Sequence, residues 1–315
     1  MAGDSTLAAV VVNYRSSALL EANIGPLSTS AVRLVIVDNY SDDLERHRLR
    51  VLASHWDCTL VELPTNAGFA AGVNAGVRAA TEQGCEQFLL LNPDARVSVT
   101  TIEELQRQSC RDPLALISPQ LLDPAGRVVF SGSLLDLRDG RIRRWPTEAG
   151  AMEPTAHLVP WLTAACLVVT HELWERVGGF AEEYFMYWED VDFNYRCLAA
   201  GARLRLRTDL SATHEQGGTQ GMRRGRAKSG LYYHFNCRNR LLFGIRHLNR
   251  RALVRWILLT PQVSWEILLQ GGRRQFLHSP ARVWSAATGA VSGLVRACVA
   301  LRRRDHLILL RKRSI

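Results

Sequence analysis

A chain of 315 residues can bury a sizeable core, and this length favours one large α/β domain with an appendage over two domains of equal size. The composition, 47% hydrophobic and 22% charged, is that of a globular protein and excludes a disordered or collagen-like chain. The charge is divided unevenly: residues 220–315 carry 20 Lys and Arg against Glu266 and Asp305, a net charge of +18, although the whole chain carries +9. The first 219 residues therefore carry −9, and we expect the basic tail to contact an anionic surface or ligand.

The cysteines and the N-terminus both indicate the cytoplasm. Seven cysteines are scattered without a CxxC pair and are odd in number, so we expect reduced thiols, mostly in the core. Residues 1–5 lack the basic stretch of a signal peptide and run straight into a strand-like segment. We therefore expect a cytoplasmic protein, peripheral to the inner face of a membrane if the basic tail binds lipid.

The first third of the chain alternates apolar runs with helical periodicity. Runs rich in Val, Ile and Leu predict strands over residues 7–14, 32–39, 59–63 and 87–92. Helical stretches such as 70–83 separate them, which predicts a mostly parallel central sheet flanked by helices on both faces. Because ligands gather at the carboxyl ends of parallel strands, we expect Asn13, Asp38 and Asp94 to face one site.

The middle of the chain carries two shorter strand-like stretches within residues 114–213, followed by a helix. This helix is predicted to begin near Glu189 and to end at Gly201, because glycine commonly follows the last turn of a helix.

From Gly230 onward the pattern is helical, with Trp and Leu supplying apolar surface among arginines. Within it, residues 252–269 are barely long enough to span a bilayer and contain three unfavourable residues, Arg255, Pro261 and Glu266. We interpret this region as amphipathic helix lying at a membrane interface rather than spanning it.

Three carboxylates, Glu189, Asp190 and Asp192, follow an aromatic run and open the predicted helix. The partial positive charge of a helix start favours acids, so one of them serves naturally as a cap. Capping does not account for all three. Crowded acids raise one another's pKa and are usually kept together to take a proton or to hold a cation.

Five motifs stand in a fixed order along the chain. They are Val-Val-Val-Asn-Tyr at 10–14, Val-Ile-Val-Asp-Asn at 35–39, Asn-Ala-Gly-Phe-Ala-Ala-Gly-Val-Asn at 66–74, Leu-Asn-Pro-Asp at 91–94 and the aromatic and acidic run at 185–193. In order and spacing they resemble the inverting glycosyltransferases of family 2, and within that family the rhamnosyltransferase-like branch. The resemblance covers roughly residues 7–247 and implies a GT-A fold with a nucleotide-activated sugar as donor.

The resemblance also implies a domain organisation. A GT-A domain is expected over residues 1–229, with a nucleotide-sugar half over about 1–112 and an acceptor half over about 113–229. A basic amphipathic helical extension is expected to follow over 230–315.

On the acceptor side, the resemblance makes Asp190 the catalytic base, which deprotonates the acceptor hydroxyl in a single inverting displacement. Glu189 is expected to assist it, and Glu189 or Asp192 to orient the acceptor or cap the helix. Trp161 belongs to the segment where an acceptor pocket is expected. Trp188 is expected either to stack on a sugar face or to pack in the core.

On the donor side, Asn13 and Asp38 are expected to contact the base and ribose, and Asn66, Gly68 and Asn74 to admit the nucleotide or donor sugar. Two structural alternatives stay open: Asp38 as part of a turn, and the glycines as aids to chain reversal and helix packing.

The motif at Asn92 and Asp94 stands where the family has its DxD signature, with asparagine in place of the first acid. The resemblance implies that Asp94 binds Mg²⁺ or Mn²⁺ with Asn92 as a helper, because these cations need only one or two protein carboxylates beside phosphates and water. His214 resembles the first residue of the family's HxxG element, here 214–217, and is expected as a second metal ligand or as a structural histidine.

The leading hypothesis is a transferase that moves a deoxyhexose such as rhamnose from a dTDP donor to a hydroxyl of a glycan, glycolipid or secondary metabolite. UDP-hexose and UDP-furanose donors stay open. The basic tail suggests a lipid-linked acceptor and an anionic membrane, or contacts in a homo-oligomer, and no nucleic acid is expected. The alternative from a different class is a catalytically inert protein that binds polyanions or membranes.

Overall fold

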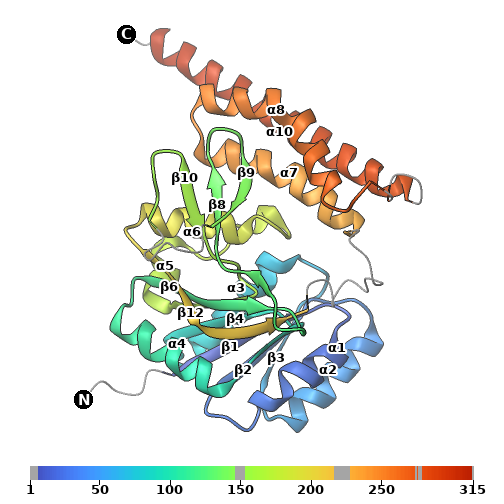
Figure 1. Ribbon diagram of the computed structural model, residues 1–315, viewed down its shortest axis with the longest axis vertical. Helices are drawn as coiled ribbons and strands as arrows, with labels where there is room; N and C mark the ends of the chain where they lie inside the picture. Colours follow the sequence, from blue (N-terminus) through green and yellow to red (C-terminus); the bar gives the residue numbers. More distant parts are fainter. Residues whose placement is uncertain (1–5, 146–152, 216–227, 274, 276–278, 314–315) are drawn as a thin grey trace. The chain divides into compact units, whose positions relative to one another are not determined.

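The computed structural model describes residues 6–145, 153–215, 228–273, 275 and 279–313, with side chains through Arg303 (Figure 1). The chain forms two compact units. The sheet unit comprises Met1–Leu135 and Arg143–Gly221, and the helical unit comprises Asp136–Ile142 and Met222–Ile315. The described parts of the two units in the second half end at residue 215 and begin at residue 228, and the boundary expected at 229 and 230 stays a prediction.

The sheet unit is built on a nine-stranded sheet. Its strands are β1 (Leu7–Asn13), β2 (Arg33–Asp38), β3 (Thr59–Glu62), β4 (Gln87–Leu91), β5 (Ala95–Val97), β6 (Ala115–Leu122), β7 (Val128–Phe130), β11 (Cys166–Thr170) and β12 (Arg203–His214). They lie in the order β3-β2-β1-β4-β11-β6-β12-β5, with β7 paired to β6. All four strands predicted in the first third of the chain are present.

The strands are parallel in one half of the sheet and mixed in the other. From β3 through β2 and β1 to β4, every pair is parallel. Strand β11 then runs antiparallel to β4 and β6, while β12 is parallel to β6 and antiparallel to β5. The predicted α/β class is confirmed. Because β11 is antiparallel, Cys166 at its start lies opposite Leu91 at the end of β4, so the segment before β11 lies at the carboxyl edge of the parallel strands.

In the described part of the sheet unit, these helices accompany the sheet: α1 (Ser17–Asn23), α2 (Asp43–His55), α3 (Phe69–Glu82), α4 (Val99–Arg111), α5 (His171–Val177) and α6 (Glu189–Ala199), with the 3-10 turns η1 (Gly25–Leu27) and η2 (Glu182–Tyr184). Helices α2, α4 and α5 each begin at a side-chain cap, Asp42, Ser98 and Thr170, which accepts from a backbone N–H three residues later. Gly201 follows α6 with a φ of +86°, as its predicted role at the end of the helix requires.

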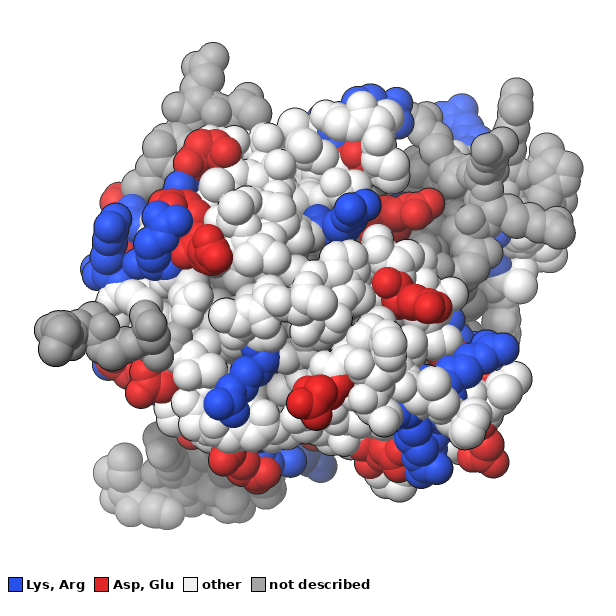
Figure 2. Space-filling view, turned by 90° about the horizontal axis from the view of Figure 1, so that it is seen from below, with Lys and Arg blue, Asp and Glu red and all other residues white. Residues whose placement is uncertain are grey.

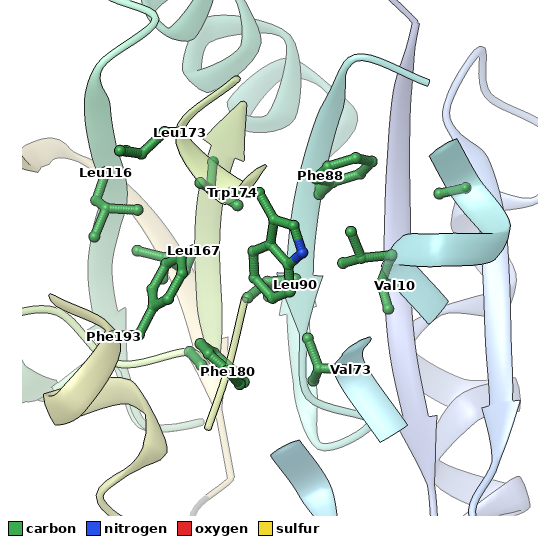
Figure 3. Close-up of a cluster of buried hydrophobic side chains, with 14 of the residues drawn as sticks. Val10, Val73, Phe88, Leu90, Leu116, Leu167, Leu173, Trp174, Phe180 and Phe193 are labelled. Atoms are coloured by element: carbon green, nitrogen blue, oxygen red, sulfur yellow. The ribbon is translucent and has the colours of Figure 1, made fainter. Parts of the chain in front are cut away.

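Both faces of the sheet are covered by packed side chains. Alternate residues of β1 belong to two different buried clusters, one with Ala8, Val10 and Val12 and the other with Leu7, Ala9 and Val11. In the first cluster, shown in Figure 3, Trp174 packs against the rings of Phe180 and Phe193 at centroid distances of 5.4 and 5.1 Å. On the same face α3 approaches β1 so closely that a Cβ at Gly72 would lie 2.7 Å from the Val12 side chain. This packing is the structural role left open for that glycine.

Charged side chains of the sheet unit are largely paired across its surface. Arg50 and Glu62 are 2.6 Å apart, and Arg176 and Glu172 are 2.8 Å apart. On the face of the molecule seen in Figure 2, acidic and basic side chains are interspersed in small groups.

A three-stranded sheet, in the order β10-β8-β9, is formed by β8 (Ser133–Asp136), β9 (Arg141–Arg144) and β10 (Leu158–Trp161). The helical unit contains α7 (Gly230–His247), α8 (Arg250–Leu269) and α10 (Pro280–Arg313), as predicted for the chain beyond Gly230. In this unit Arg141 binds both carboxylate oxygens of Glu266 at 2.7 Å. The buried Arg240 donates to the carbonyl of Trp256 at 3.1 Å and lies 4.8 Å over its ring.

Two helices among the described residues, Arg250–Leu269 and Pro280–Arg303, are long and apolar enough to cross a membrane by length and composition. Core helices of soluble proteins pass the same test, so this is weak support for membrane association. The prediction that 252–269 is too polar to span therefore does not hold on composition alone. All seven cysteines are free thiols, and four of them are buried.

Candidate active site

Strands β1 and β2 end side by side, which places two predicted site residues at one edge of the sheet. Asn13 stands opposite Asp38 in the parallel register, and the backbone N–H of Asn39 donates to the Asn13 carbonyl at 3.0 Å. Strand β4 runs parallel to β1 on its other side, so the turn that begins at Asn92 leaves the sheet at the same edge.

Asn13 is buried, and its side-chain amide is used within the protein. Its Nδ2 donates to Glu45 at 3.1 Å, and its Oδ1 accepts from the Ser16 hydroxyl at 2.8 Å. Glu45 also accepts from the backbone N–H and the hydroxyl of Ser17 at 2.7 and 2.8 Å, which ties the start of α1 to α2. Asn13 thus helps to fix the turn after β1, and its contact with a nucleotide stays a prediction.

Asp38 is buried, and one of its carboxylate oxygens is paired. Its Oδ2 forms an ion pair with Arg46 at 2.5 Å, and the Arg46 guanidinium lies 4.6 Å over the ring of Tyr40. Its Oδ1 is buried and has no hydrogen-bond partner among the described residues. Leaving such an acceptor unsatisfied costs roughly 1–3 kcal/mol, so Asp38 is suited to accept a hydrogen bond from an incoming base or ribose.

Asn39 holds the loop that precedes α3. Its Nδ2 donates to Asn66 Oδ1 and to the Gly68 carbonyl, each at 3.1 Å, and its Oδ1 accepts from the N–H of Ala67 at 2.9 Å. Two predicted donor-side residues, Asn66 and Gly68, are thereby brought against the end of β2. The sequence analysis did not assign this role to Asn39, although an asparagine directly after a buried strand was a signal for it.

Gly68 lies against the aromatic segment that precedes the acidic cluster. It has a φ of +90°, and a Cβ at this position would lie 2.5 Å from the carbonyl oxygen of Phe185. That oxygen accepts from the N–H groups of Phe69 and Ala70 at 2.6 and 3.4 Å. Backbone of the same chain therefore caps the first turn of α3, and the close approach of a donor to Gly68 stays a prediction.

Asn74 connects α3 to the chain just before η2. Its Oδ1 accepts from the N–H of Phe180 and its Nδ2 donates to the Phe180 carbonyl, both at 2.9 Å. Its Nδ2 also donates to Glu182 at 2.9 Å. These bonds give Asn74 a scaffolding role beside its predicted contact with the donor.

Three residues immediately before α6 have left-handed backbone conformations. The φ angles are +65° at Phe185, +63° at Tyr187 and +76° at Trp188. Side chains other than glycine cost of order 1–3 kcal/mol each in such sparsely populated conformations, which cluster at functional sites when the surrounding structure enforces them. Trp188 is 5% exposed, so its predicted stacking on a sugar would use only a small part of the ring.

Asp192 is fully buried in a network that anchors α6. Its Oδ1 accepts from the Tyr184 hydroxyl at 3.0 Å, and its Oδ2 pairs with Arg196 at 2.7 Å. Arg196 in turn donates to the carbonyls of Val177 and Gly179 at 2.5 and 2.6 Å. The predicted contact of Asp192 with a substrate would require this network to open.

Glu189 and Asp190 are adjacent but differ in their hydrogen bonds. Burial raises the pKa of Glu189 well above its ordinary value, the charge of Asp190 adds to the effect, and Glu189 Oε2 has no partner among the described residues. Burial also raises the pKa of Asp190 to about 6, but hydrogen bonds from the backbone of Val191 and Ala164 and from the Thr163 side chain favour its charged form. Burial thus favours the neutral form of Glu189, whereas the hydrogen bonds to Asp190 favour the charged form of that carboxylate.

A short segment, which we call strap 162–165, links the acidic cluster to the turn after β4. The N–H of Ala164 donates to Asp190 Oδ2 at 3.4 Å. One residue later, the carbonyl of Ala165 accepts from the N–H of Asn92 at 3.0 Å. The strap thus joins the predicted base to the motif that contains the predicted metal ligand.

Asn194 fixes the strap to α6. It is fully buried, its Oδ1 accepts from the N–H of Leu162 at 3.0 Å, and its Nδ2 donates to the carbonyls of Leu162 and Asp190 at 2.9 and 2.7 Å. The sequence analysis missed this residue. Its signal was an asparagine four positions after Asp190, on the same face of the helix.

The two predicted metal ligands lie side by side. Strand β12 pairs with β5 so that His214 is opposite Ala95, and His214 Nε2 is 3.1 Å from Asp94 Oδ1. Both side chains are mostly buried, and His214 Nδ1 has no partner among the described residues. A carboxylate oxygen and an imidazole nitrogen fit a divalent transition-metal ion, and a carboxylate alone fits Mg²⁺.

The protein part of such a metal site would be small. No group of three or more His, Cys, Asp or Glu able to hold a metal occurs within the described part of the chain, so the pair of Asp94 and His214 would depend on ligands from the substrate. Gly217, the end of the predicted HxxG element, lies outside the described residues.

Trp161 ends β10 and packs against Phe130 at a centroid distance of 5.4 Å. Its indole N–H is buried without a partner among the described residues. Trp161 shares this property with Asp38, Glu189 and His214, which were all predicted as site residues. Unsatisfied buried polar atoms in native proteins call for an explanation, and a ligand or an ordered water supplies one.

Comparisons with known proteins agree on one family. Residues 9–144 match the family described as Glycosyl transferase family 2. The low-salt glycan biosynthesis hexosyltransferase of Haloferax volcanii is 26% identical over 241 residues, which cover 75% of this chain and 74% of that protein. The N-acetylglucosaminyl-diphospho-decaprenol L-rhamnosyltransferase of Mycobacterium tuberculosis is 28% identical over 220 residues, 62% of this chain and 71% of its own length. The dTDP-rhamnosyl transferase RfbF of Shigella flexneri is 23% identical over 219 residues, 68% of this chain and 70% of its own length.

Among solved structures, the chain is similar to the mannosyltransferase PcManGT of Pyrobaculum calidifontis, which was solved with GDP-Man and Mn²⁺. The TM-score is 0.55 and the identity 18%, with 93% of this chain and 86% of that chain covered. This likeness concerns the fold.

Proposed function

We propose that this chain, which belongs to glycosyltransferase family 2 and has a GT-A fold, moves a deoxyhexosyl group such as rhamnose from dTDP-rhamnose to an acceptor hydroxyl with inversion at the anomeric carbon. Two relatives support this donor by their names, one a dTDP-rhamnosyl transferase and the other an L-rhamnosyltransferase. The rhamnosyltransferase acts on a decaprenol-linked sugar, which supports a lipid-linked glycan as the acceptor class.

The observation that carries the proposed mechanism is the hydrogen bonding of Asp190. Strap 162–165 and the start of α6 both donate to its carboxylate, so the charged form is held in a fixed orientation. In the reaction, the acceptor oxygen forms a bond to the anomeric carbon as its proton passes to Asp190. The bond from that carbon to the diphosphate oxygen breaks at the same time, and the diphosphate leaves with the electron pair.

Glu189 has a different part in this proposal. Because burial raises the pKa of Glu189 and favours its neutral form, Glu189 is less suited than Asp190 to act as the base. Its Oε2 lacks a partner among the described residues, so the carboxyl group is suited to hydrogen-bond an acceptor hydroxyl and orient it.

We assign the divalent ion, Mg²⁺ or Mn²⁺, to Asp94 and His214, with Asn92 as a helper. Support comes from the 3.1 Å approach of the two side chains. When bound, the ion would supply positive charge that stabilises the departing diphosphate.

For the nucleotide and donor sugar, we assign the carboxyl edge of β1 and β2 and the loop before α3. Asp38 offers a buried acceptor oxygen, and Asn39 keeps Asn66 and Gly68 beside it. Asn13 and Asn74 are engaged in bonds within the protein, so we assign them to the support of this region first.

The experiment that tests the proposal offers purified protein a panel of dTDP-, UDP- and GDP-sugars with Mg²⁺ or Mn²⁺. Slow donor hydrolysis and protection against thermal unfolding are recorded. We expect dTDP-rhamnose to respond, and a response to UDP-hexose or UDP-furanose instead would correct the donor. If the folded protein hydrolyses none of the donors and none of them protects it against thermal unfolding, the result would favour an inert polyanion-binding protein.

A pair of variants tests the base. Asp190→Asn should lower turnover by about 10²–10⁴-fold and leave donor binding unchanged. Asp209→Asn is the matched control, because Asp209 is an exposed carboxylate paired with Arg207 and should keep full turnover. Equal turnover in the two variants would remove Asp190 from the mechanism.

A further inference from the structure

The outward face of α10 is apolar. Trp284 is 72% exposed, Val291 and Val295 are each 58% exposed, and Val299 is 44% exposed. Their spacing of seven, four and four residues places them on one stripe of the helix, which we call the α10 stripe. A stripe of this kind in water normally marks a contact surface.

The opposite side of α10 fixes this orientation. Ala286, Gly289, Gly293 and Ala297 are buried there, and α10 packs along α7. A Cβ at Gly289 would collide with the carbonyl of His234, and one at Gly293 would lie 3.1 Å from the carbonyl of Arg238. The helix cannot turn to bury its valines, because the side that faces α7 has no room for side chains.

Helix α8, which packs beside α10, repeats the pattern. Leu258 is 74% exposed and Trp265 is 52% exposed, while Trp256 on the other side is buried. Arg251 and Arg255 are exposed on the same face as Leu258, at the preceding turns. Each helix thus offers a tryptophan and aliphatic side chains to the outside, with arginine nearby.

Charged side chains from residue 228 to residue 303 are predominantly basic. Residues 228–303 contain a single acid, Glu266, and Arg141 binds both of its oxygens. Arg296, Arg302 and Arg303 are exposed on α10. An excess of exposed arginine attracts anions from outside the protein.

We propose that the exposed faces of α8 and α10 dock on an anionic lipid surface, with both helices lying in the plane of the headgroups. Tryptophan and aliphatic side chains enter the boundary between headgroups and acyl chains, and arginines contact the lipid phosphates. An open apolar hollow of about 530 Å³, lined by residues that include Pro280, Val283 and Trp284, adds apolar surface at the start of the stripe. The purpose of docking, access to a lipid-linked acceptor, rests on the proposed function.

The same observations disfavour the other occupants. A second copy would bring two segments of +18 charge together, which repel. A nucleic acid would satisfy the arginines but leave the valines and tryptophans in water. Spanning helices would place the exposed Arg255 of α8 and Arg296 of α10 among acyl chains, where charged side chains are costly.

The test is co-sedimentation of the full chain with vesicles of phosphatidylcholine, with and without phosphatidylglycerol. We expect binding that requires phosphatidylglycerol and weakens with salt. The triple variant Trp284→Ser, Val291→Ser, Val295→Ser should bind roughly tenfold more weakly or worse. The control triple Leu44→Ser, Val51→Ser, Val128→Ser removes apolar side chains of 53–60% exposure from the sheet unit and should bind like the parent.

A second variant keeps the proposal testable if the triple variant of the α10 stripe fails to fold. Arg251→Gln with Arg255→Gln changes exposed side chains and should lower the preference for phosphatidylglycerol by roughly tenfold or more, because each arginine near the surface is attracted to anionic lipid. Unchanged binding in both variants, or equal losses in the stripe and control triples, would overturn the proposal.

Two further outcomes would contradict docking on an anionic lipid surface in the plane of the headgroups. Retention in the vesicles after alkaline carbonate extraction would indicate spanning helices. Concentration-dependent dimers that the stripe variant abolishes, without vesicle binding, would indicate a second copy. Donor hydrolysis is measured in parallel for every variant, so a failure of the proposed transferase activity is separable from a failure of docking.

Discussion

In the sheet unit, α3 presses Gly72 and Gly76 against β1, and the apolar side chains of the helix face inward. In the helical unit, α10 presses Gly289 and Gly293 against α7, yet the valines on its far side face outward. Glycine permits close approach of backbones in both places. The two helices differ in the face that points away from these glycines. In α3 the apolar side chains are part of the core, whereas in α10 the apolar side chains are exposed and available to a partner.

The distribution of charge follows the same division. Many acids and bases of the sheet unit pair with one another, and the buried Asp38 and Asp192 form ion pairs with Arg46 and Arg196. The helical unit keeps its arginines in excess and neutralises Glu266 internally. The sheet unit is thus suited to fix the orientation of a reacting carboxylate, and the helical unit is suited to bind an anionic surface. If this comparison is correct, each unit can be damaged without loss of the other's activity.

Among the variants that should affect one unit and spare the other, we expect the largest effect from a change at Asp94, one of the two proposed metal ligands. Asp94→Ala should weaken metal-dependent nucleotide binding by about 100-fold or more, because it removes the carboxylate ligand. Calorimetric titration of the nucleotide with and without Mn²⁺ measures this effect, and vesicle co-sedimentation of the same variant should be unchanged. Nucleotide binding that keeps its dependence on metal would remove Asp94 from the site.

The next effect tests the rigidity of the sheet unit. Asn194→Ala removes three hydrogen bonds that hold strap 162–165 and Asp190, and should lower kcat by about 10–100-fold with little change in the KM of the donor. Its control is Thr170→Ala, which removes a buried cap and a hydrogen bond to Pro113 at the other end of β11. Both variants should lose roughly 1–3 kcal/mol of stability. A parallel fall of kcat in the control would show that Asn194 acts through general stability alone.

A third variant breaks the helical unit alone. Gly289→Val introduces a branched side chain against the backbone of α7 and should destabilise that packing by roughly 1–3 kcal/mol or more. We expect weaker vesicle binding and an earlier thermal transition, with donor hydrolysis retained at temperatures below that transition. Simultaneous loss of donor hydrolysis would show that the two units unfold as one.

The smallest expected effect concerns pH. The pKa of Asp190 is raised to about 6, so the base form is lost as pH falls through that value, and kcat should fall about tenfold for each unit below it. The Thr163 side chain favours the charged form, so Thr163→Val should move this acidic limb upward, by less than about one unit. A pH profile that is identical in the two proteins would exclude Thr163 as a modulator of Asp190.

Much of the fold was predictable because continuous apolar runs have few alternatives. The runs that became β1, β2, β3 and β4 were each placed to within a residue or two, since a strand covered on both faces needs an unbroken apolar sequence. The antiparallel insertion of β11 was not predictable. Its five residues read like those of a parallel strand, and only the pairing of Cys166 with Leu91 reveals its direction.

The candidate site divides in the same way. Glu189, Asp190 and Asp94 stood out because acids at strand ends and helix starts are few and chemically specific. Asn39 and Asn194 did not, because an asparagine that clamps backbone is identical in sequence to one in a turn. Asp192 and Asn13 carried a functional expectation, whereas the structure shows both of them engaged in internal hydrogen bonds.

The sequence by itself determined the α/β class, the order of the motifs and the basic character of the last third of the chain, because periodicity, spacing and charge are properties of the chain alone. The tertiary structure decided how far Glu189 and Asp190 are buried, which amides hold the strap and which side of α10 faces outward. Those outcomes depend on burial and on hydrogen bonds between residues far apart in the chain, such as Leu162 with Asn194 and Asp94 with His214. Neither burial nor such pairing exists until the chain has folded.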